Sequence, residues 1–325
     1  MNQLLPSRVE LDAAAKIVYG AMPPTPQYAW PMLQERFGAE VWIKHENHTP
    51  TGSFKVRGGL FYLHGLARQD SGILGVISAT RGNHGQSIGF AARRHVVAAT
   101  IVVQYGNSRE KNAAMRALGV TLIEHGSEFQ ESREYAKRLA EEARLHMIPS
   151  CHRDLVSGVA SYWMEFLSSQ PDLDLVFVPI GQGSGICAAI AARNALGLST
   201  RIVGVVSTHA PAYKLSFEQG RKIESPVTAV IADGMACRVP DDASLAVIMD
   251  YVEEIVAVSD SEVAAAMRLY YIATHNVAEG AGAAPLAALM HKKTRLKGKK
   301  IGLPLCGGNV DHDLFARILT PPEQQ

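Results

Sequence analysis

The sequence lacks an excess of charge of either sign, which restricts the partners that it can bind. Thirty-two Lys and Arg residues offset 31 Asp and Glu residues over 325 positions, so the formal net charge at pH 7 is +1. Proteins that bind nucleic acid or an anionic membrane surface ordinarily carry a basic patch or tract. This chain shows no block of like charges. We therefore expect a small-molecule substrate and no nucleic-acid partner.

The cysteines are few and scattered, and no long hydrophobic run is present. The four cysteines, at positions 151, 187, 237 and 306, form no CxxC pair and no metal-ligand or disulfide spacing, which is typical of a reducing compartment. No apolar segment approaches the roughly 18–20 residues that span a bilayer. The first residues also lack the basic start and apolar core of a signal peptide. These features predict a cytoplasmic protein with no membrane partner.

Short apolar runs rich in branched residues alternate with longer segments of helical pattern. This alternation is typical of parallel sheets covered by helices, and the length of the chain suits two domains. The near-continuous apolar run at 175–180 indicates a strand buried on both faces. We expect strands at 41–44, 73–78, 100–103, 121–124, 175–180, 202–206, 254–258 and 300–305, and helices that include 57–68, 85–94, 109–118, 128–144, 185–196 and 261–275.

The segment 48–59, HTPTGSFKVRGG, brings a lysine to the start of an expected helix. The turn-forming stretch 50–53 precedes Lys55, so the lysine lies near the positive end of the helix dipole, which disfavours its charged form. A neutral amine is useful if this group must act as a nucleophile and then as a base. Taken alone, the pattern also fits an ordinary solvent-exposed lysine.

The segment 78–86, SATRGNHGQ, follows an expected strand and precedes an expected helix. Ligands of open α/β sheets bind at the carboxyl ends of strands, and the backbone amides of a helix start can bind a carboxylate. Asn83 adds a side chain that can both donate and accept a hydrogen bond. An ordinary strand–turn–helix connection with a polar cap would look similar.

The segment 179–186, PIGQGSGI, has alternate glycines between an apolar strand and a helix, an arrangement that favours phosphate binding. A dinucleotide site would need GxGxxG and an acidic residue at the end of the next strand, but that strand ends in Val206, Ser207 and Thr208. A nucleoside-triphosphate loop would need GK followed by Ser or Thr. Neither is present, so we expect a monophosphate.

The segment 303–311, LPLCGGNVD, also lies at the end of an apolar strand. Gly307 and Gly308 permit close approach of another backbone, and Cys306 lies where the strand ends. A small buried hydrophobic residue before a turn is the ordinary interpretation of such a cysteine.

Taken together and in this order, the four segments resemble the threonine/serine dehydratase branch of the fold-type-II pyridoxal-phosphate enzymes, the tryptophan synthase β-like group. The resemblance runs from about Thr25 to Asp311. It implies an α/β fold of two domains with mostly parallel, helix-covered sheets, a pyridoxal 5'-phosphate cofactor and a homo-oligomer, as a dimer. It places a small domain at 45–149 and a large domain at 1–44 and 150–325, with the cofactor between them.

The resemblance also implies a role for each segment. Lys55 is the catalytic Schiff-base lysine, with Phe54 beside the cofactor ring, and Asn83 binds the ring's 3'-hydroxyl. Cys306 faces the pyridine nitrogen, where relatives carry Ser or Cys. The implied phosphate ligands are Gly181, Gln182, Gly183, Ser184 and Gly185. The implied substrate-binding residues are Thr80, Asn83 and His84, and Arg81 between them is a further candidate although it departs from the family pattern.

A thiol at the pyridine nitrogen predicts the type of reaction. A thiol is a weak, neutral donor and leaves the ring a weaker electron sink than a carboxylate would, which favours prompt elimination from Cβ. We therefore expect a lyase that converts a 3-hydroxy L-amino acid to a 2-oxo acid and ammonia. Threonine, serine, phenylserine and hydroxyaspartate are candidate substrates. A β-replacement synthase, a racemase and a non-catalytic cofactor-binding homologue are the alternatives.

Three departures from the family pattern bear on substrate and ions. Arg81 stands where racemases of the group carry an acid/base serine, and a guanidinium has no titratable proton near neutral pH, so we do not expect racemisation. Whether Arg81 contacts a carboxylate or phosphate, or points to solvent, is left open. The glycine segment carries Gln182 and Ser184 where relatives have consecutive glycines. Ser207 replaces an acidic residue of a divalent-cation site, so we expect no such metal, whereas a monovalent cation bound by carbonyls stays open.

Because the chain ends soon after the Cys306 segment, we expect no regulatory carboxy-terminal domain and, as a hypothesis, a role in amino acid catabolism.

Overall fold

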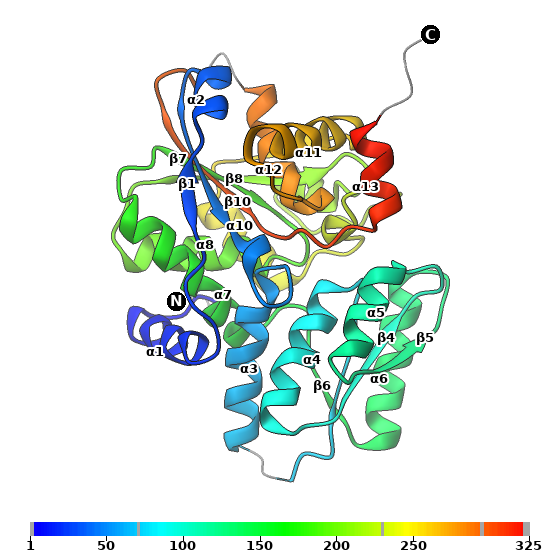
Figure 1. Cartoon of the computed structure of the whole chain (residues 1–325). Coiled ribbons are helices and arrows are strands. Elements are labelled where there is room, and N and C mark those ends of the chain that lie inside the picture. Colours follow the sequence, from blue (N-terminus) through cyan, green and yellow to red (C-terminus); the bar gives the residue numbers. More distant parts are fainter. Residues whose placement is uncertain (1–2, 70–71, 229–230, 293–295, 321–325) are drawn as a thin grey trace.

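A computed structural model describes residues 3–69, 72–228, 231–292 and 296–320 of the chain (Figure 1). It contains two separate sheets with helices packed around them. The six-stranded sheet has the order β1-β2-β10-β7-β8-β9, and the four-stranded sheet has the order β5-β4-β3-β6. The strands are β1 (Gln27–Ala29), β2 (Glu40–His45), β3 (Val76–Ala79), β4 (Ala99–Val103), β5 (Thr121–Glu124), β6 (His146–Met147), β7 (Leu175–Pro179), β8 (Arg201–Ser207), β9 (Glu254–Val258) and β10 (Lys300–Leu305).

The helices join successive strands, as the alternating sequence pattern predicts. Figure 1 shows α4, α5 and α6 beside the four-stranded sheet, and α8, α10, α11 and α12 beside the six-stranded sheet. The helices are α1 (Arg8–Tyr19), α2 (Pro31–Phe37), α3 (Lys55–Gln69), α4 (Asn83–His95), α5 (Arg109–Ala117), α6 (Phe129–Ala143), α7 (Arg153–Ser169), α8 (Ser184–Ala195), α9 (Ala212–Gln219), α10 (Asp242–Tyr251), α11 (Asp260–Thr274), α12 (Gly280–His291) and α13 (His312–Leu319), with short 3₁₀ turns η1 (Glu46–His48) and η2 (Asp233–Met235). Within the described ranges, no helix is both long enough and apolar enough to cross a membrane.

The predicted α/β fold with mostly parallel, helix-covered sheets is confirmed. Every recorded pairing between named strands is parallel except that of β1 with β2. The central strand β7 shows why this fold needs continuous apolar strands. Leu175 and Phe177 pack into the hydrophobic cluster on one face of the sheet, whereas Val176 and Val178 pack into the cluster on the other face.

One expected strand begins later than the sequence suggested. The run 73–78 is apolar, but β3 begins only at Val76, where its pairing with Ala99 of β4 starts. Apolar residues before that point therefore have no partner strand. The structure also adds strands that are too short to recognise in the sequence, β1 with three residues and β6 with two.

Three neighbouring parallel strands of the large sheet bring the predicted segments together. The order β2-β10-β7 is continuous, so the carboxyl ends of these strands lie at one edge of the sheet. The chain leaves β2 toward Lys55, leaves β10 at Cys306 and leaves β7 toward Gly181. Asn83 is the first residue of α4, which follows β3 of the four-stranded sheet.

A buried ionic network fixes the beginning of α3. The Arg57 side chain is fully buried, and its guanidinium donates to both carboxylate oxygens of Glu46, at 2.7 and 2.9 Å, and to Glu165 at 2.6 Å. Lys44 also bonds Glu165 and donates to the carbonyl oxygen of Thr25 at 2.8 Å. Two cations thus balance two carboxylates, and the network joins α3 to α7 and to the end of β2.

Replacement of Arg57 by Met should destabilise the fold strongly. It leaves the Glu46 and Glu165 carboxylates with less compensation, and breaking a buried ion pair from one side costs about 3–5 kcal/mol. The free energy of unfolding from urea denaturation measures this loss. Arg8→Met is the matched control, because the exposed pair between Arg8 and Asp12 contributes at most about 1 kcal/mol. Equal losses in the two variants would contradict this role for Arg57.

Candidate active site

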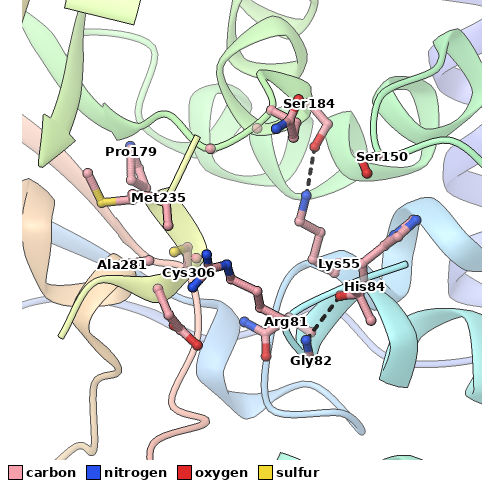
Figure 2. Close-up of a pocket in the computed structure, with 18 of the residues that line it drawn as sticks. Lys55, Arg81, Gly82, His84, Ser150, Pro179, Ser184, Met235, Ala281 and Cys306 are labelled. Atoms are coloured by element: carbon pink, nitrogen blue, oxygen red, sulfur yellow. Dashed lines mark hydrogen bonds between the residues drawn. The ribbon is translucent and has the colours of Figure 1, made fainter. Parts of the chain in front are cut away.

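All of the catalytic, cofactor-binding and substrate-binding residues that the sequence predicts line one cavity between the two sheets. Figure 2 shows Lys55, Arg81, His84, Ser184 and Cys306 around it. The cavity brings together side chains and backbone that are more than 250 positions apart in the chain. The singled-out residues at its wall are Phe54, Lys55, Thr80, Arg81, Asn83, His84, Gly181, Gln182, Gly183, Ser184, Gly185 and Cys306. Their roles toward a ligand stay predictions.

Lys55 is the first residue of α3, and its amine points into the cavity. The amine donates a hydrogen bond to the hydroxyl of Ser184, at 3.0 Å (Figure 2). Burial lowers the pKa of the Lys55 ammonium, although Cys151, Cys306 and Glu279 partly oppose the shift. Desolvation therefore favours the neutral amine, which is the nucleophilic and basic form.

The turn before Lys55 is bonded to the end of β10. The N–H of Phe54 donates to the carbonyl oxygen of Cys306 at 3.0 Å, and the N–H of Gly308 donates to the carbonyl oxygen of Gly52 at 2.9 Å. These two bonds hold the Lys55 turn against the Cys306 segment. Burial raises the pKa of the Cys306 thiol well above its ordinary value, and the nearby Glu279 acts in the same direction. Cys306 is therefore a neutral thiol at physiological pH.

The glycine loop, residues 181–185, presents its backbone to the cavity at the start of α8. The carbonyl oxygen of Gln182 accepts hydrogen bonds from the hydroxyls of Tyr213 and Ser244, each at 3.2 Å. In a trans peptide the following N–H points the opposite way, so the amide of Gly183 faces away from these hydroxyls. Gly183, with φ +99°, is the N-cap of α8, and no side chain caps this helix start. The first backbone N–H groups of α8 therefore have no side-chain partner, and N–H groups in this position suit an anion.

Close approach of neighbouring backbone requires glycine in this loop. A Cβ added at Gly181 would lie 2.5 Å from the carbonyl oxygen of Gly234 in η2, and a Cβ at Gly183 would collide with Ser244. The Gln182 side chain does not point at Lys55 and instead donates to the Cys237 sulfur at 3.4 Å. The expected contribution of Gln182 thus comes from its backbone, whereas Ser184 contributes its hydroxyl.

Asn83 is held by two side chains that the sequence did not reveal. Its Nδ2 donates to Glu279 at 2.7 Å, and its Oδ1 accepts from Asn309 at 2.9 Å. Asn309 also donates to the carbonyl oxygen of Thr51 at 2.8 Å, so it links the Asn83 turn to the Lys55 turn. A carboxamide nitrogen carries two hydrogens. One N–H of Asn83 is therefore left for a ligand.

The remaining residues of the 80–84 turn differ in charge. The Thr80 hydroxyl accepts from the N–H of Gly82 at 3.0 Å. Burial, together with the Lys55 charge, lowers the pKa of His84 to about 3, so its imidazole is neutral. Arg81 is only partly buried and carries a full charge into the cavity.

A cluster of charged residues at the cavity was missed by sequence reasoning. Lys111 of α5 bonds Asp233 of η2 at 2.7 Å and lies 3.5 Å from the second carboxylate oxygen of Glu279. Burial raises the pKa of Glu279 from 4.5 to about 7, an effect that the Lys111 charge opposes. Each residue is a single polar position in an unremarkable local context, and only the packing of α5 against η2 and α12 assembles them.

The described residues contain no group of three or more His, Cys, Asp and Glu side chains that could hold a metal ion. Ser207 is the residue at which the sequence predicts the loss of a divalent-cation site. It is buried, and its hydroxyl accepts a hydrogen bond from the N–H of His209 at 3.1 Å.

The chain belongs to the pyridoxal-phosphate-dependent enzymes, because the model of that family matches residues 18–307. It is 32% identical to an L-threonine ammonia-lyase of Thermotoga maritima over 89% of this chain and 72% of the relative. It is also 32% identical to an L-threo-3-hydroxyaspartate ammonia-lyase of a Pseudomonas species, over 97% of this chain and 99% of the relative. The solved structure of maize serine racemase superimposes with a TM-score of 0.89 at 25% identity, covering 96% of each chain.

The shifted pKa of Glu279 predicts a pH-dependent stability that Glu279→Gln removes. A carboxyl whose pKa rises from 4.5 to about 7 on folding binds more protons in the folded state between these values. Its contribution to stability is full below about pH 4.5 and is lost as the pH rises through about 7. Urea denaturation from about pH 5 to about pH 8 should therefore show the variant gaining stability relative to the wild type. If the difference in the free energy of unfolding between the variant and the wild type stayed constant with pH, the raised pKa of Glu279 would be contradicted.

Removal of divalent metal should leave the protein unaffected. Ser207 offers a hydroxyl where the sequence predicts that a divalent-cation site is lost, and hydroxyls alone are poor ligands for Mg²⁺ or Ca²⁺. Dialysis against EDTA should leave both the melting temperature and the activity unchanged. Inhibition by EDTA that added Mg²⁺ reverses would show that a divalent site exists.

Proposed function

We propose that this enzyme is a pyridoxal-phosphate-dependent ammonia-lyase that converts a 3-hydroxy L-amino acid to a 2-oxo acid and ammonia by α,β-elimination. The observation that carries the proposal is the Lys55 amine, buried toward its neutral form between the glycine loop and the 80–84 turn. Family membership supplies the cofactor. The names of the two curated relatives, both ammonia-lyases, support the reaction.

The residues at the cavity fit the cofactor. Lys55 would hold its aldehyde carbon, and the glycine loop with the Ser184 hydroxyl would hold its phosphate through the amides at the start of α8. The free N–H of Asn83 would reach the ring's 3'-hydroxyl, and Cys306 would face the ring nitrogen, with Phe54 beside the ring. When bound, the cofactor acts as an electron sink for the bond that breaks at Cα.

The protein's own contribution to the reaction is the placement of a base and of polar groups for the substrate. Lys55 Nζ would remove the proton from Cα of the substrate, and the Ser184 hydroxyl 3.0 Å away orients the amine. The Thr80 hydroxyl and the backbone amides at the start of α4 would bind the substrate carboxylate, since Gly82 at its N-cap provides no side-chain cap. Neutral His84 adds a polar side chain without adding charge.

The state of Cys306 supports elimination over the alternatives on this fold. Its thiol is held neutral by burial and cannot supply the negative charge that stabilises a protonated ring nitrogen. Loss of a leaving group from Cβ is then favoured over a long-lived carbanion. Racemisation needs an acid/base group on the second face, where the chain has Arg81. β-Replacement needs a second nucleophile, so formation of ammonia and a 2-oxo acid without one distinguishes the lyase.

The wider organisation of the protein is part of the same proposal. We infer a small domain at 45–149 and a large domain formed by 1–44 and 150–325, which close over the substrate. The strands of the four-stranded sheet all lie in the first range, which supports this division. The four cysteines are free thiols, which supports a cytoplasmic location. Family resemblance supports a homo-oligomer, as a dimer, and leaves a monovalent-cation requirement open.

Lys55→Ala should abolish both cofactor attachment and turnover. Reduction of the wild-type holoprotein with borohydride, followed by peptide mapping, should place the label on Lys55. The variant should lose at least about 10²–10⁴-fold in the rate of 2-oxo acid formation, the usual contribution of a positioned general base.

Lys16→Ala is the matched control, because Lys16 is an exposed lysine on α1. This variant should still carry the borohydride-reduced cofactor on Lys55 and should keep the wild-type activity. A label on another lysine would refute the assignment of Lys55. Absence of ammonia from a panel of 3-hydroxy amino acids would refute the lyase while leaving the cofactor site intact.

A further inference from the structure

Arg81 is an unpaired cation at the cavity. Its Nε atom is buried and has no hydrogen-bond partner within the part of the chain that the structure describes. Desolvation lowers the pKa of Arg81, and the more distant charges of Asp233 and Glu128 only partly oppose this shift. A guanidinium nevertheless keeps its proton at physiological pH. A desolvated charge of this kind is costly unless it gains a partner.

The two carboxylates that attract Arg81 are already engaged with other cations. Asp233 bonds Lys111 at 2.7 Å, and Glu128 bonds Arg238 at 3.1 Å. Glu279, the other acidic residue at the cavity wall, accepts from Asn83 and lies 3.5 Å from Lys111. The described residues therefore leave the guanidinium to be neutralised by a ligand.

The cofactor phosphate is not the anion that Arg81 is placed to bind. The glycine loop and the Ser184 hydroxyl lie on one side of the Lys55 amine. Figure 2 shows the Arg81 side chain on the other side, extending toward the wall that carries Met235 and Cys306. The substrate's α-carboxylate also has its own site, because the amides that begin α4 and the Thr80 hydroxyl are available to it.

We propose that Arg81 binds an anionic group on the substrate's side chain, so that the preferred substrates are 3-hydroxy amino acids with a carboxylate on Cβ. This inference rests on the proposed function and names its substrate class. Elimination from such a substrate breaks the Cα–H and Cβ–O bonds and releases one water. Hydrolysis then consumes one water, so the products are ammonia and a 2-oxo dicarboxylic acid. A guanidinium suits this task because it can bind a carboxylate with two parallel hydrogen bonds.

Steady-state kinetics of the holoenzyme on 3-hydroxyaspartate and on threonine tests the proposal. The two substrates share the α-amino acid group and the 3-hydroxyl, and they differ in a carboxylate against a methyl group. Arg81→Met should lower the ratio of kcat/KM for 3-hydroxyaspartate to kcat/KM for threonine by about 10- to 100-fold, the range expected for one lost charge-assisted interaction. Arg81→Lys should retain part of the preference, because lysine keeps the positive charge but cannot form the two parallel hydrogen bonds of a guanidinium.

Arg238→Met is the matched control. It removes the same charge from a half-exposed arginine that pairs with Glu128 and does not line the cavity. Its ratio should stay within about 3-fold of the wild type, since exposed pairs interact weakly. Equal losses of kcat/KM on both substrates in Arg81→Met would assign the guanidinium to the shared α-carboxylate or to the cofactor, and unchanged kcat/KM values on both substrates would assign it to neither. Both results overturn the proposal.

A binding measurement separates this inference from the proposed function. If the wild type converts neither substrate, the lyase assignment fails, but calorimetry on the holoprotein still compares succinate with butyrate. Weaker binding of succinate in Arg81→Met, with butyrate unchanged, would support a site for a second carboxylate. Equal affinities of the wild type for succinate and butyrate would overturn it.

Discussion

The structure depends on burying a lysine amine beside a helix start, and the Arg57 network makes this placement rigid. Arg57 lies two residues after Lys55 on the same helix, and its fully buried guanidinium bonds Glu46 before the Lys55 turn and Glu165 on α7. The first turn of α3 is thus held from both sides. Because an ion pair inside the protein tolerates little displacement, the amine is kept in a half-buried position at the cavity, where desolvation lowers its pKa.

The rest of the site follows from parallel strands that end at one edge of a sheet. β2, β10 and β7 are neighbours, so the Lys55 turn, Cys306 and the glycine loop meet without any long connection inside the cavity. Asn309 completes the assembly, since its single carboxamide bonds both Thr51 and Asn83. Through this residue the four-stranded sheet, which carries Asn83, is coupled to the strand ends of the six-stranded sheet.

Local signals explain what the sequence could predict. Lys55, Asn83, the glycine loop and Cys306 each lie at or shortly after the end of an apolar strand, and turn-forming residues near them mark that strand end before any contact is known. Lys111, Asp233 and Glu279 have no such context, because they meet only through tertiary packing. The strands β1 and β6 were missed for a different reason. With three and two residues they are too short for a period-of-two pattern, and their pairing with neighbours defines them.

The cavity holds side chains that burial drives toward neutral forms together with one arginine that keeps its charge. Lys55, Cys306 and His84 are all driven toward neutral forms by burial, so the region around the reacting carbon carries little fixed charge. Lys111 is a cation, but Asp233 neutralises it. Arg81 is left as the cation without an ion-pair partner among the described residues at the cavity. A partly desolvated charge of this kind interacts more strongly with an anionic ligand than it would in bulk water. If Arg81 binds the substrate side chain as proposed, substrate choice can change through residue 81 without changing Lys55, Cys306 or His84.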